Sequence, residues 1–141
     1  FKVNKIYPNT LSINLEETIP LAKIFIDGEP FYVGENEKIY RSENINQSLP
    51  IIKGYAELNQ INKILNILNK SSFKSKKIIE YLVYFPSNRW DIHLKDNFKI
   101  RLPSQVNLQL IENSYLLLND DRINAKIIDL RIDQKIVTSN D

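Results

Sequence analysis

Apolar and polar residues alternate near the end of the chain, in the pattern of a strand with one buried face. In residues 127–137 the apolar positions are Ile128, Leu130, Ile132 and Ile136. The charged positions between them are Asp129, Arg131, Asp133 and Lys135. Successive strand side chains point to opposite faces, so one set faces the core and the other faces solvent. Few residues follow, so we expect the outer edge of this strand to have no further strand beside it.

Shorter alternations predict strands in the first part of the chain. Residues 2–15 predict two strands around a turn, and Pro20 marks a junction after them. Residues 21–41 predict short strands joined by tight turns. Residues 42–54 predict a loop, because a proline and a glycine interrupt any regular pattern there.

A β-hairpin is predicted in the second half of the chain. The apolar residues of its two arms are Trp90, Ile92 and Leu94, then Phe98, Ile100 and Leu102. Asp96 and Asn97 stand between the arms. These two residue types tolerate the positive φ that a two-residue hairpin turn requires, so the turn is placed there.

Two segments have the period of an amphipathic helix. In residues 55–70 the apolar stripe is Leu58, Ile61, Ile64, Leu65 and Leu68. The second helix is predicted to begin at Pro103-Ser104, with Ser104 as its N-cap, and to end at Asp120-Asp121. Its apolar stripe is Leu108, Ile111, Tyr115 and Leu118.

This order of elements predicts an α+β fold. We expect one twisted, mostly antiparallel sheet with two main helices packed on one of its faces. The chain has 141 residues, of which 43% are hydrophobic and 26% are charged. These values are typical of a globular protein, with one domain or with one domain and part of another.

Charge and composition exclude several classes of protein. The net charge of +2 and the spread of lysines argue against nucleic-acid binding, and the cluster Lys74, Lys76, Lys77 is interpreted as a surface turn. The absence of cysteine excludes disulfides, thiol catalysis and Cys-type zinc sites. The chain also has no methionine, which indicates a fragment or a processed product. No apolar run approaches the length of a membrane span, so any such span is expected outside these residues.

The residues that could carry catalysis are few. His93 is the only histidine, and it takes an outward position on a predicted strand. Glu16 and Glu17 are adjacent, so in a strand they point to opposite faces and cannot share a proton. Asp120-Asp121 is explained by a turn, and three glycines do not form a phosphate loop. We therefore expect no catalytic residue, no metal site and no cofactor.

Four stretches, in order, resemble motifs of the bacterial cell-division family FtsQ/DivIB. The stretches are KIYPNTLSINLEETIPLAKI (5–24), LPIIKG (49–54), NRWDIHLKDNFKIRLP (88–103) and IIDLRIDQKIV (127–137). Asn88 stands where the family has the first of two arginines, so the partner contact of that arginine is not carried over to this chain. Asn97 stands where the family usually has glycine, and asparagine can adopt the same left-handed conformation.

The resemblance implies a bitopic inner-membrane protein at the division septum, with its membrane helix outside these residues. Residues 1–20 would be the last strands of a truncated POTRA domain, and residues 21–141 would be the β domain. This fragment would lie in the periplasm. The implied function is a non-enzymatic scaffold of the divisome that recruits FtsB-like and FtsL-like membrane-anchored proteins, linking early and late division proteins.

The resemblance also implies a binding site, because in the family the last strand of the β domain receives a strand from FtsB. The corresponding residues are Asp129, Leu130, Arg131, Ile132, Asp133, Gln134, Lys135, Ile136, Val137 and Arg89. We expect Ile132 and Val137 to be apolar contacts, and Arg131 and Arg89 to pair with acidic groups of the partner. The charges on the strand could select the partner or could prevent aggregation at an open edge. An apolar face that only closes the core would give the same alternation.

Two other functions fit parts of the sequence. A POTRA-like periplasmic module would dock unfolded outer-membrane or secreted chains at a sheet edge. A peptidoglycan-binding domain would need an aromatic groove, for which Trp90, Tyr81, Tyr84 and Phe85 are the candidates, although packing in the hairpin core explains them more simply.

Overall fold

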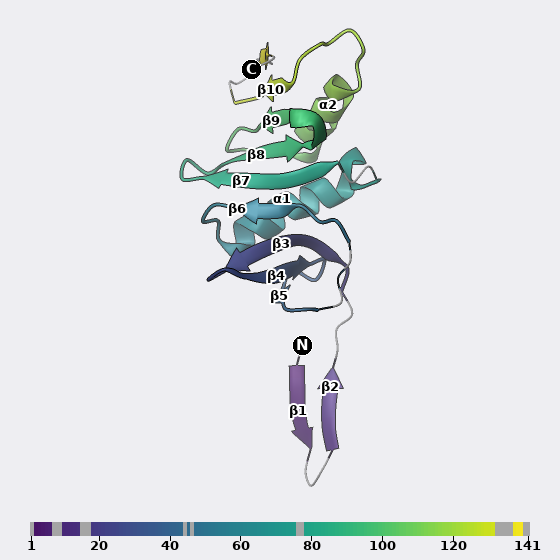
Figure 1. The fold of residues 1–141 in the computed structure, drawn as a ribbon, viewed down its shortest axis with the longest axis vertical. Coiled ribbons are helices and arrows are strands. Elements are labelled where there is room, and N and C mark those ends of the chain that lie inside the picture. The colour runs from purple at the N-terminus through teal and green to yellow at the C-terminus, as the bar shows by residue number, and fades with distance from the viewer. Residues whose placement is uncertain are drawn as a thin grey trace.

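The computed structural model describes residues 2–6, 10–14, 18–43, 45, 47–75, 78–131 and 137–139. Their strands form two sheets (Figure 1). β1 (Lys2–Ile6) and β2 (Thr10–Asn14) pair antiparallel as a separate two-stranded sheet, where two strands were predicted. All the other strands belong to one nine-stranded sheet.

The nine-stranded sheet has the order β11-β10-β9-β8-β7-β6-β3-β4-β5. Its strands are β3 (Pro20–Ile26), β4 (Glu29–Gly34), β5 (Ile39–Tyr40), β6 (Ile51–Lys53), β7 (Ile79–Phe85), β8 (Arg89–Leu94), β9 (Lys99–Arg101), β10 (Ile127–Asp129) and β11 (Val137–Ser139). Five of the eight strand pairings are antiparallel and three are parallel. The predicted α+β class and mostly antiparallel sheet are therefore confirmed.

The strand β6 lies inside a segment that was predicted as a loop. It pairs parallel with β3 on one side and with β7 on the other. The prediction of a loop across residues 42–54 is therefore wrong at this strand. Three residues are too few to show an alternation, and the strand is fixed by its two neighbours, not by its own pattern.

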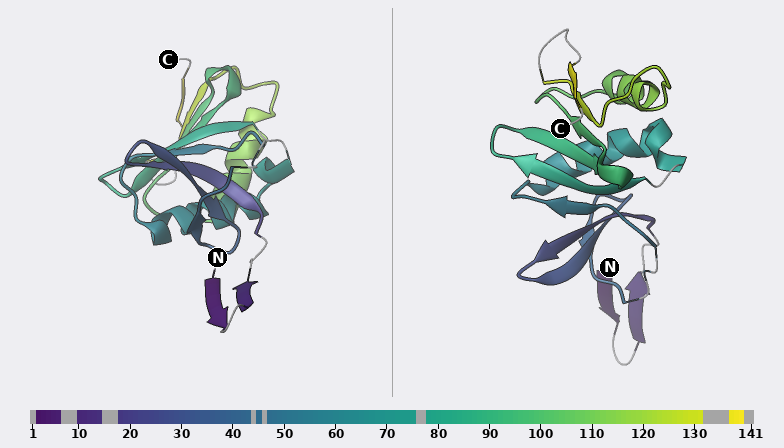
Figure 2. Two further views of the ribbon diagram at one scale, coloured as in Figure 1. Left: turned by 60° about the horizontal axis from the view of Figure 1, so that its bottom comes forward. Right: turned by 45° about the horizontal axis from the view of Figure 1, so that its top comes forward.

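Two helices cover one face of the sheet. α1 (Leu58–Lys70) and α2 (Leu108–Leu118) lie behind the strands in Figure 1, and the turned views of Figure 2 agree. The buried side chains of α1 are Ile61, Ile64, Leu65 and Leu68, four of the five residues of the predicted stripe. They form one core with sheet residues that include Leu82, Ile92 and Ile100. The prediction of two helices on one face is confirmed.

The start of α2 differs from the prediction. Its N-cap is Asn107, whose side-chain Oδ1 accepts the backbone N–H of Leu110 at 2.8 Å. Val106 and Ile111 both pack against the core on either side of this cap, an arrangement that fixes the angle at which the chain enters the helix. Ser104 is therefore not the cap. The stripe is displaced as well, because Leu108 is 40% exposed while Ser114 is buried.

The hairpin predicted around Asp96-Asn97 is confirmed. Ile92 pairs with Ile100 across its two strands, and both lie in the core. Asp96 and Asn97 have φ of 63° and 65°, the left-handed values that the turn requires. Asparagine thus replaces glycine here without loss of the turn.

The last predicted strand is two strands. β10 ends at Asp129, and β11 pairs antiparallel with it, Val137 opposite Asp129. At the end of β10 the Asp129 side chain accepts the backbone N–H of Arg131 at 3.0 Å. This local turn uses a donor that a continuous strand would need for its ladder, so the regular strand stops. The prediction of one strand across residues 127–137 is wrong.

Candidate partner-binding edge

The edge of the sheet lies one strand farther out than the sequence predicts. β10 pairs parallel with β9 on one side and antiparallel with β11 on the other, so neither flank of β10 is free. The prediction that no strand lies beside residues 127–129 is therefore wrong. In the described part of the chain, β11 (Val137–Ser139) is the last strand at this end of the sheet. Among the described residues, the strand whose backbone groups could meet a partner at this end is therefore β11.

Asp129 and Arg131 form an ion pair beside this edge. Arg131 Nε donates to Asp129 Oδ1 at 2.8 Å, and its Nη2 contacts Oδ2 of the same carboxylate. Side-chain hydrogen bonding to Arg131 lowers the pKa of Asp129 below its ordinary value, although burial opposes this shift. The same bond raises the pKa of Arg131. A partner carboxylate would therefore compete with Asp129 for this guanidinium.

The other predicted contact residues have different positions. The side chain of Leu130 is buried in the core, and its backbone N–H donates to the carbonyl of Arg101 at 2.8 Å. Neither group of Leu130 is available at the surface. Val137 begins β11, where its backbone pairs with Asp129. The remaining predicted contacts lie outside the described residues: Ile132, Asp133, Gln134, Lys135 and Ile136.

Arg89 lies at the start of β8, where its Nε donates to Ser87 Oγ at 2.9 Å. Its charge and that of Arg131 both act on one carboxylate, Asp91. Asp91 is a residue that the sequence pattern did not indicate. The cross-strand partner of Asp91 is Arg101, a second residue that the sequence pattern did not indicate.

Asp91 is a buried carboxyl among cations. It is 9% exposed, and burial raises its pKa. The charges of Arg101, Lys99, Arg131 and Arg89 lower this pKa in turn, which shows that positive groups surround it. Arg101 Nε is itself buried and has no hydrogen-bond partner among the described residues. The alternation of residues along β8 and β9 could have indicated this cluster, but only once the register between these two strands was known.

Replacing Asp91 with asparagine is expected to change the pH dependence of stability. Because burial raises the pKa of Asp91 in the fold, the folded chain holds this proton more tightly than the unfolded chain does. The wild type therefore loses stability as the pH rises from about 4, the ordinary value, through the raised pKa. The free energy of unfolding of Asp91→Asn should increase relative to wild type over that window. Urea denaturation at a series of pH values tests this, and a constant difference between the two proteins would contradict it.

The aromatic groove considered for peptidoglycan does not form from the four candidates. Trp90 and Tyr84 are cross-strand partners in an edge-to-face contact, with 5.0 Å between ring centroids, and they pack into the core on the helix side. Tyr81 and Phe85 take the alternate positions of β7, so they point to the opposite face. One ligand cannot contact all four rings on one face.

Comparison with known proteins gives the chain a family. The model described as "Cell division protein FtsQ/DivIB, C-terminal" matches residues 22–131. This chain belongs to the FtsQ/DivIB family. Membership of the family gives it a role in bacterial cell division, as a relative of non-enzymatic division scaffolds with extracytoplasmic domains.

A solved structure supports the fold of this FtsQ/DivIB domain. The chain is similar to the major extracytoplasmic domain of the trans isomer of the bacterial cell-division protein DivIB from Geobacillus stearothermophilus. The TM-score is 0.52 and the identity is 13%, over 70% of this chain and 85% of that one. No curated protein matches the sequence. Within the described residues, no helix has the length and apolar character that crossing a membrane requires.

Proposed function

We propose that this FtsQ/DivIB domain is a scaffold that recruits FtsB-like and FtsL-like division proteins by accepting a partner strand at β11. The observation that carries the proposal is the place of β11 at the end of the sheet order, beside the Asp129–Arg131 pair. A strand at a sheet edge offers N–H and C=O groups to an incoming backbone. The family role in division makes another division protein the natural partner.

Backbone pairing at β11 is too weak to act alone. Its three residues offer about two or three ladder bonds, which contribute roughly 1 kcal/mol each. Association costs about 4–15 kcal/mol in lost freedom. Side-chain contacts must therefore contribute, and Arg131 and Arg89 are proposed to pair with acidic groups of the partner. If both proteins are anchored in one membrane, the high effective concentration lowers the affinity that is needed.

Replacing Arg131 with alanine is expected to weaken binding of a peptide from the C-terminal region of an FtsB-like protein by about tenfold, as expected for one charge-assisted contact. The chain provides a matched control. Arg122 binds Asp120 through the same three bonds, two from its guanidinium and one from its backbone N–H. Arg122→Ala should leave peptide affinity unchanged, because that pair follows α2 and does not border β11. Isothermal titration calorimetry measures both affinities.

Equal loss of affinity in Arg131→Ala and Arg122→Ala would contradict a specific contact at Arg131. The melting temperatures of both variants, measured beside the affinities, separate a binding defect from unfolding. Unrelated β-strand peptides should bind much more weakly than the FtsB-like peptide. Equal binding of all these peptides would instead favour the alternative function, a periplasmic module that docks unfolded client chains.

The proposal also covers the rest of the protein. Residues 1–20 are proposed to complete a POTRA domain, and a membrane helix outside residues 1–141 is proposed to anchor the protein at the septum. Under this arrangement the domain and its partners meet on the periplasmic side of the inner membrane.

A further inference from the structure

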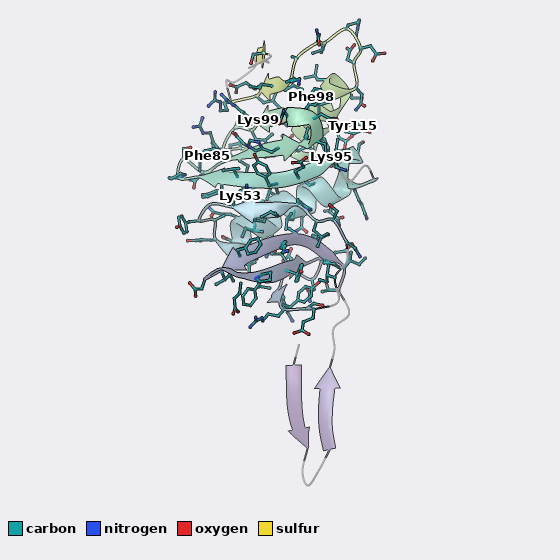
Figure 3. The ribbon with its side chains drawn as sticks, in the orientation of Figure 1. Lys53, Phe85, Lys95, Phe98, Lys99 and Tyr115 are labelled. Atoms are coloured by element: carbon teal, nitrogen blue, oxygen red, sulfur yellow. The ribbon has the colours of Figure 1, made fainter. Side chains whose placement is uncertain are left out.

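The face of the sheet opposite the helices carries two rows of side chains. The strand register aligns one row as Lys23, Ile51, Tyr81, His93, Lys99 and Ile127. The neighbouring row is Lys53, Val83, Asp91, Arg101 and Asp129. Both helices pack on the other face (Figure 2), and in these two rows only Ile127 and Asp91 are buried. Lys53, Phe85 and Lys99 extend from this open face in Figure 3.

The open face is positively charged. The register places five cations on its strands, Lys23, Lys53, Arg89, Lys99 and Arg101, against two acids, Asp91 and Asp129. The whole chain has a net charge of only +2, so positive charge is concentrated here. Asp129 is already paired with Arg131, and Asp91 is buried. Burial lowers the pKa of His93, and the charges of Lys99, Lys53 and Arg101 lower it further. The charges of this face are therefore not balanced within the described chain.

The centre of the face is ordered and partly apolar. Lys53 Nζ lies 3.8 Å from the centroid of the Tyr81 ring, and that ring stacks on His93 with centroids 4.2 Å apart and planes 14° apart. Ile51 and Val83 flank Tyr81 and are half-buried. A sheet face that is exposed only to solvent does not require an apolar centre. Aromatic rings and aliphatic side chains surrounded by cations are suited to binding a protein surface of opposite charge.

We propose that this open face docks an amphipathic α-helix of a partner protein, with an apolar stripe over Ile51, Tyr81 and Val83 and with Asp or Glu flanks that meet the cations. The ladder groups inside a sheet are already paired, so its face binds through side chains alone. A helix fits such a face because it satisfies its own backbone hydrogen bonds, and packing a helix on a sheet is the usual way to bury one.

The centre of this surface lies apart from the edge at β11, although Arg89 borders both surfaces, and the proposal goes beyond the function proposed above. Tyr81 lies on β7, four strands from β11 in the sheet order. At about 4.8 Å between strands, the two places are roughly 19 Å apart. A partner could therefore occupy the face while another strand occupies the edge, and either proposal can fail without the other.

The test uses the full chain and a synthetic probe, a helical peptide of about 18 residues with a leucine stripe flanked by glutamates. Backbone amide shifts in NMR should change mainly in β6 to β9, because the apolar stripe of the peptide would lie over Ile51, Tyr81 and Val83 on these strands. The double variant Lys53→Glu/Lys99→Glu should weaken the affinity at least about tenfold, the loss expected when contacts worth 1.4 kcal/mol or more are removed.

A matched control changes the same charge on the helix face. Lys63→Glu/Lys70→Glu alters two exposed lysines of α1 and should leave the affinity of the peptide unchanged. Equal weakening by both double variants would overturn the proposal, because it would indicate attraction to net charge alone. Equal binding of the same peptide with lysines in place of glutamates would overturn it too. Equally tight binding of unstructured polyglutamate of the same charge would overturn the assignment to a helix.

Discussion

Replacement of Gly54 with alanine is expected to destabilise the domain by about 2–4 kcal/mol. Gly54 has a φ of +96°, a conformation that side chains disfavour. A Cβ at this position would lie 2.4 Å from the backbone oxygen of Tyr84, on the strand beside β6. A backbone atom of a central strand cannot move aside as a flexible side chain would, so the sheet itself must shift. Urea denaturation of the wild type and the variant measures the loss.

Gly28 provides the matched control. It also has a positive φ, +80°, but a Cβ there would have no atom within 4 Å. Gly28→Ala should therefore cost only about 1–2 kcal/mol, the backbone penalty alone. If Gly28→Ala and Gly54→Ala were equally destabilising, the contact with Tyr84 would contribute nothing and the explanation of Gly54 would be wrong.

Truncation of the chain after Arg131 is expected to weaken binding of the FtsB-like peptide at least about thirtyfold. The truncation removes β11, and with it the two or three ladder bonds of roughly 1 kcal/mol each that a partner strand would make there. Its matched control is truncation after Ser139, which keeps β11 and should bind as the full chain does. Fluorescence anisotropy of the labelled peptide measures the three affinities.

The opposite result would identify a different binding mode. If the chain truncated after Arg131 bound more tightly, the partner strand would take the place of β11 against β10, and the proposal of addition outside β11 would be wrong. A thermal melt of each truncated chain shows whether the rest of the sheet remains folded. The buried positions Ile127 and Ile128 of β10 make some loss of stability certain, because removal of β11 uncovers their strand.

The position of Gly54 gives a physical reason for one motif of the family. The stretch LPIIKG ends at this glycine, directly after the three-residue strand β6. The glycine lets β6 approach β7 closely at the point where the chain leaves the sheet toward α1. A sequence resemblance marked this residue, and the distance to Tyr84 explains it.

The sequence by itself determined the elements whose pattern is local. The stripe of α1 and the hairpin around Asp96-Asn97, with its first arm β8, each repeat over enough residues to define a period, and the structure has them where they were predicted. The four motifs also determined the family, which the match over residues 22–131 confirms. Periodicity succeeds here because one buried face imposes it on neighbouring residues of the same segment.

Only the tertiary structure decided which strands lie side by side. The placement of β6 at the centre, the cap at Asn107, the fold of β11 onto β10 and the cluster around Asp91 depend on contacts between segments distant in sequence. A three-residue strand has no period to detect. Ser104 and Asn107 are both suitable N-cap residue types, and the packing of Val106 and Ile111 favours Asn107. The candidate edge and the charged open face likewise follow from strand register, which long-range pairing sets.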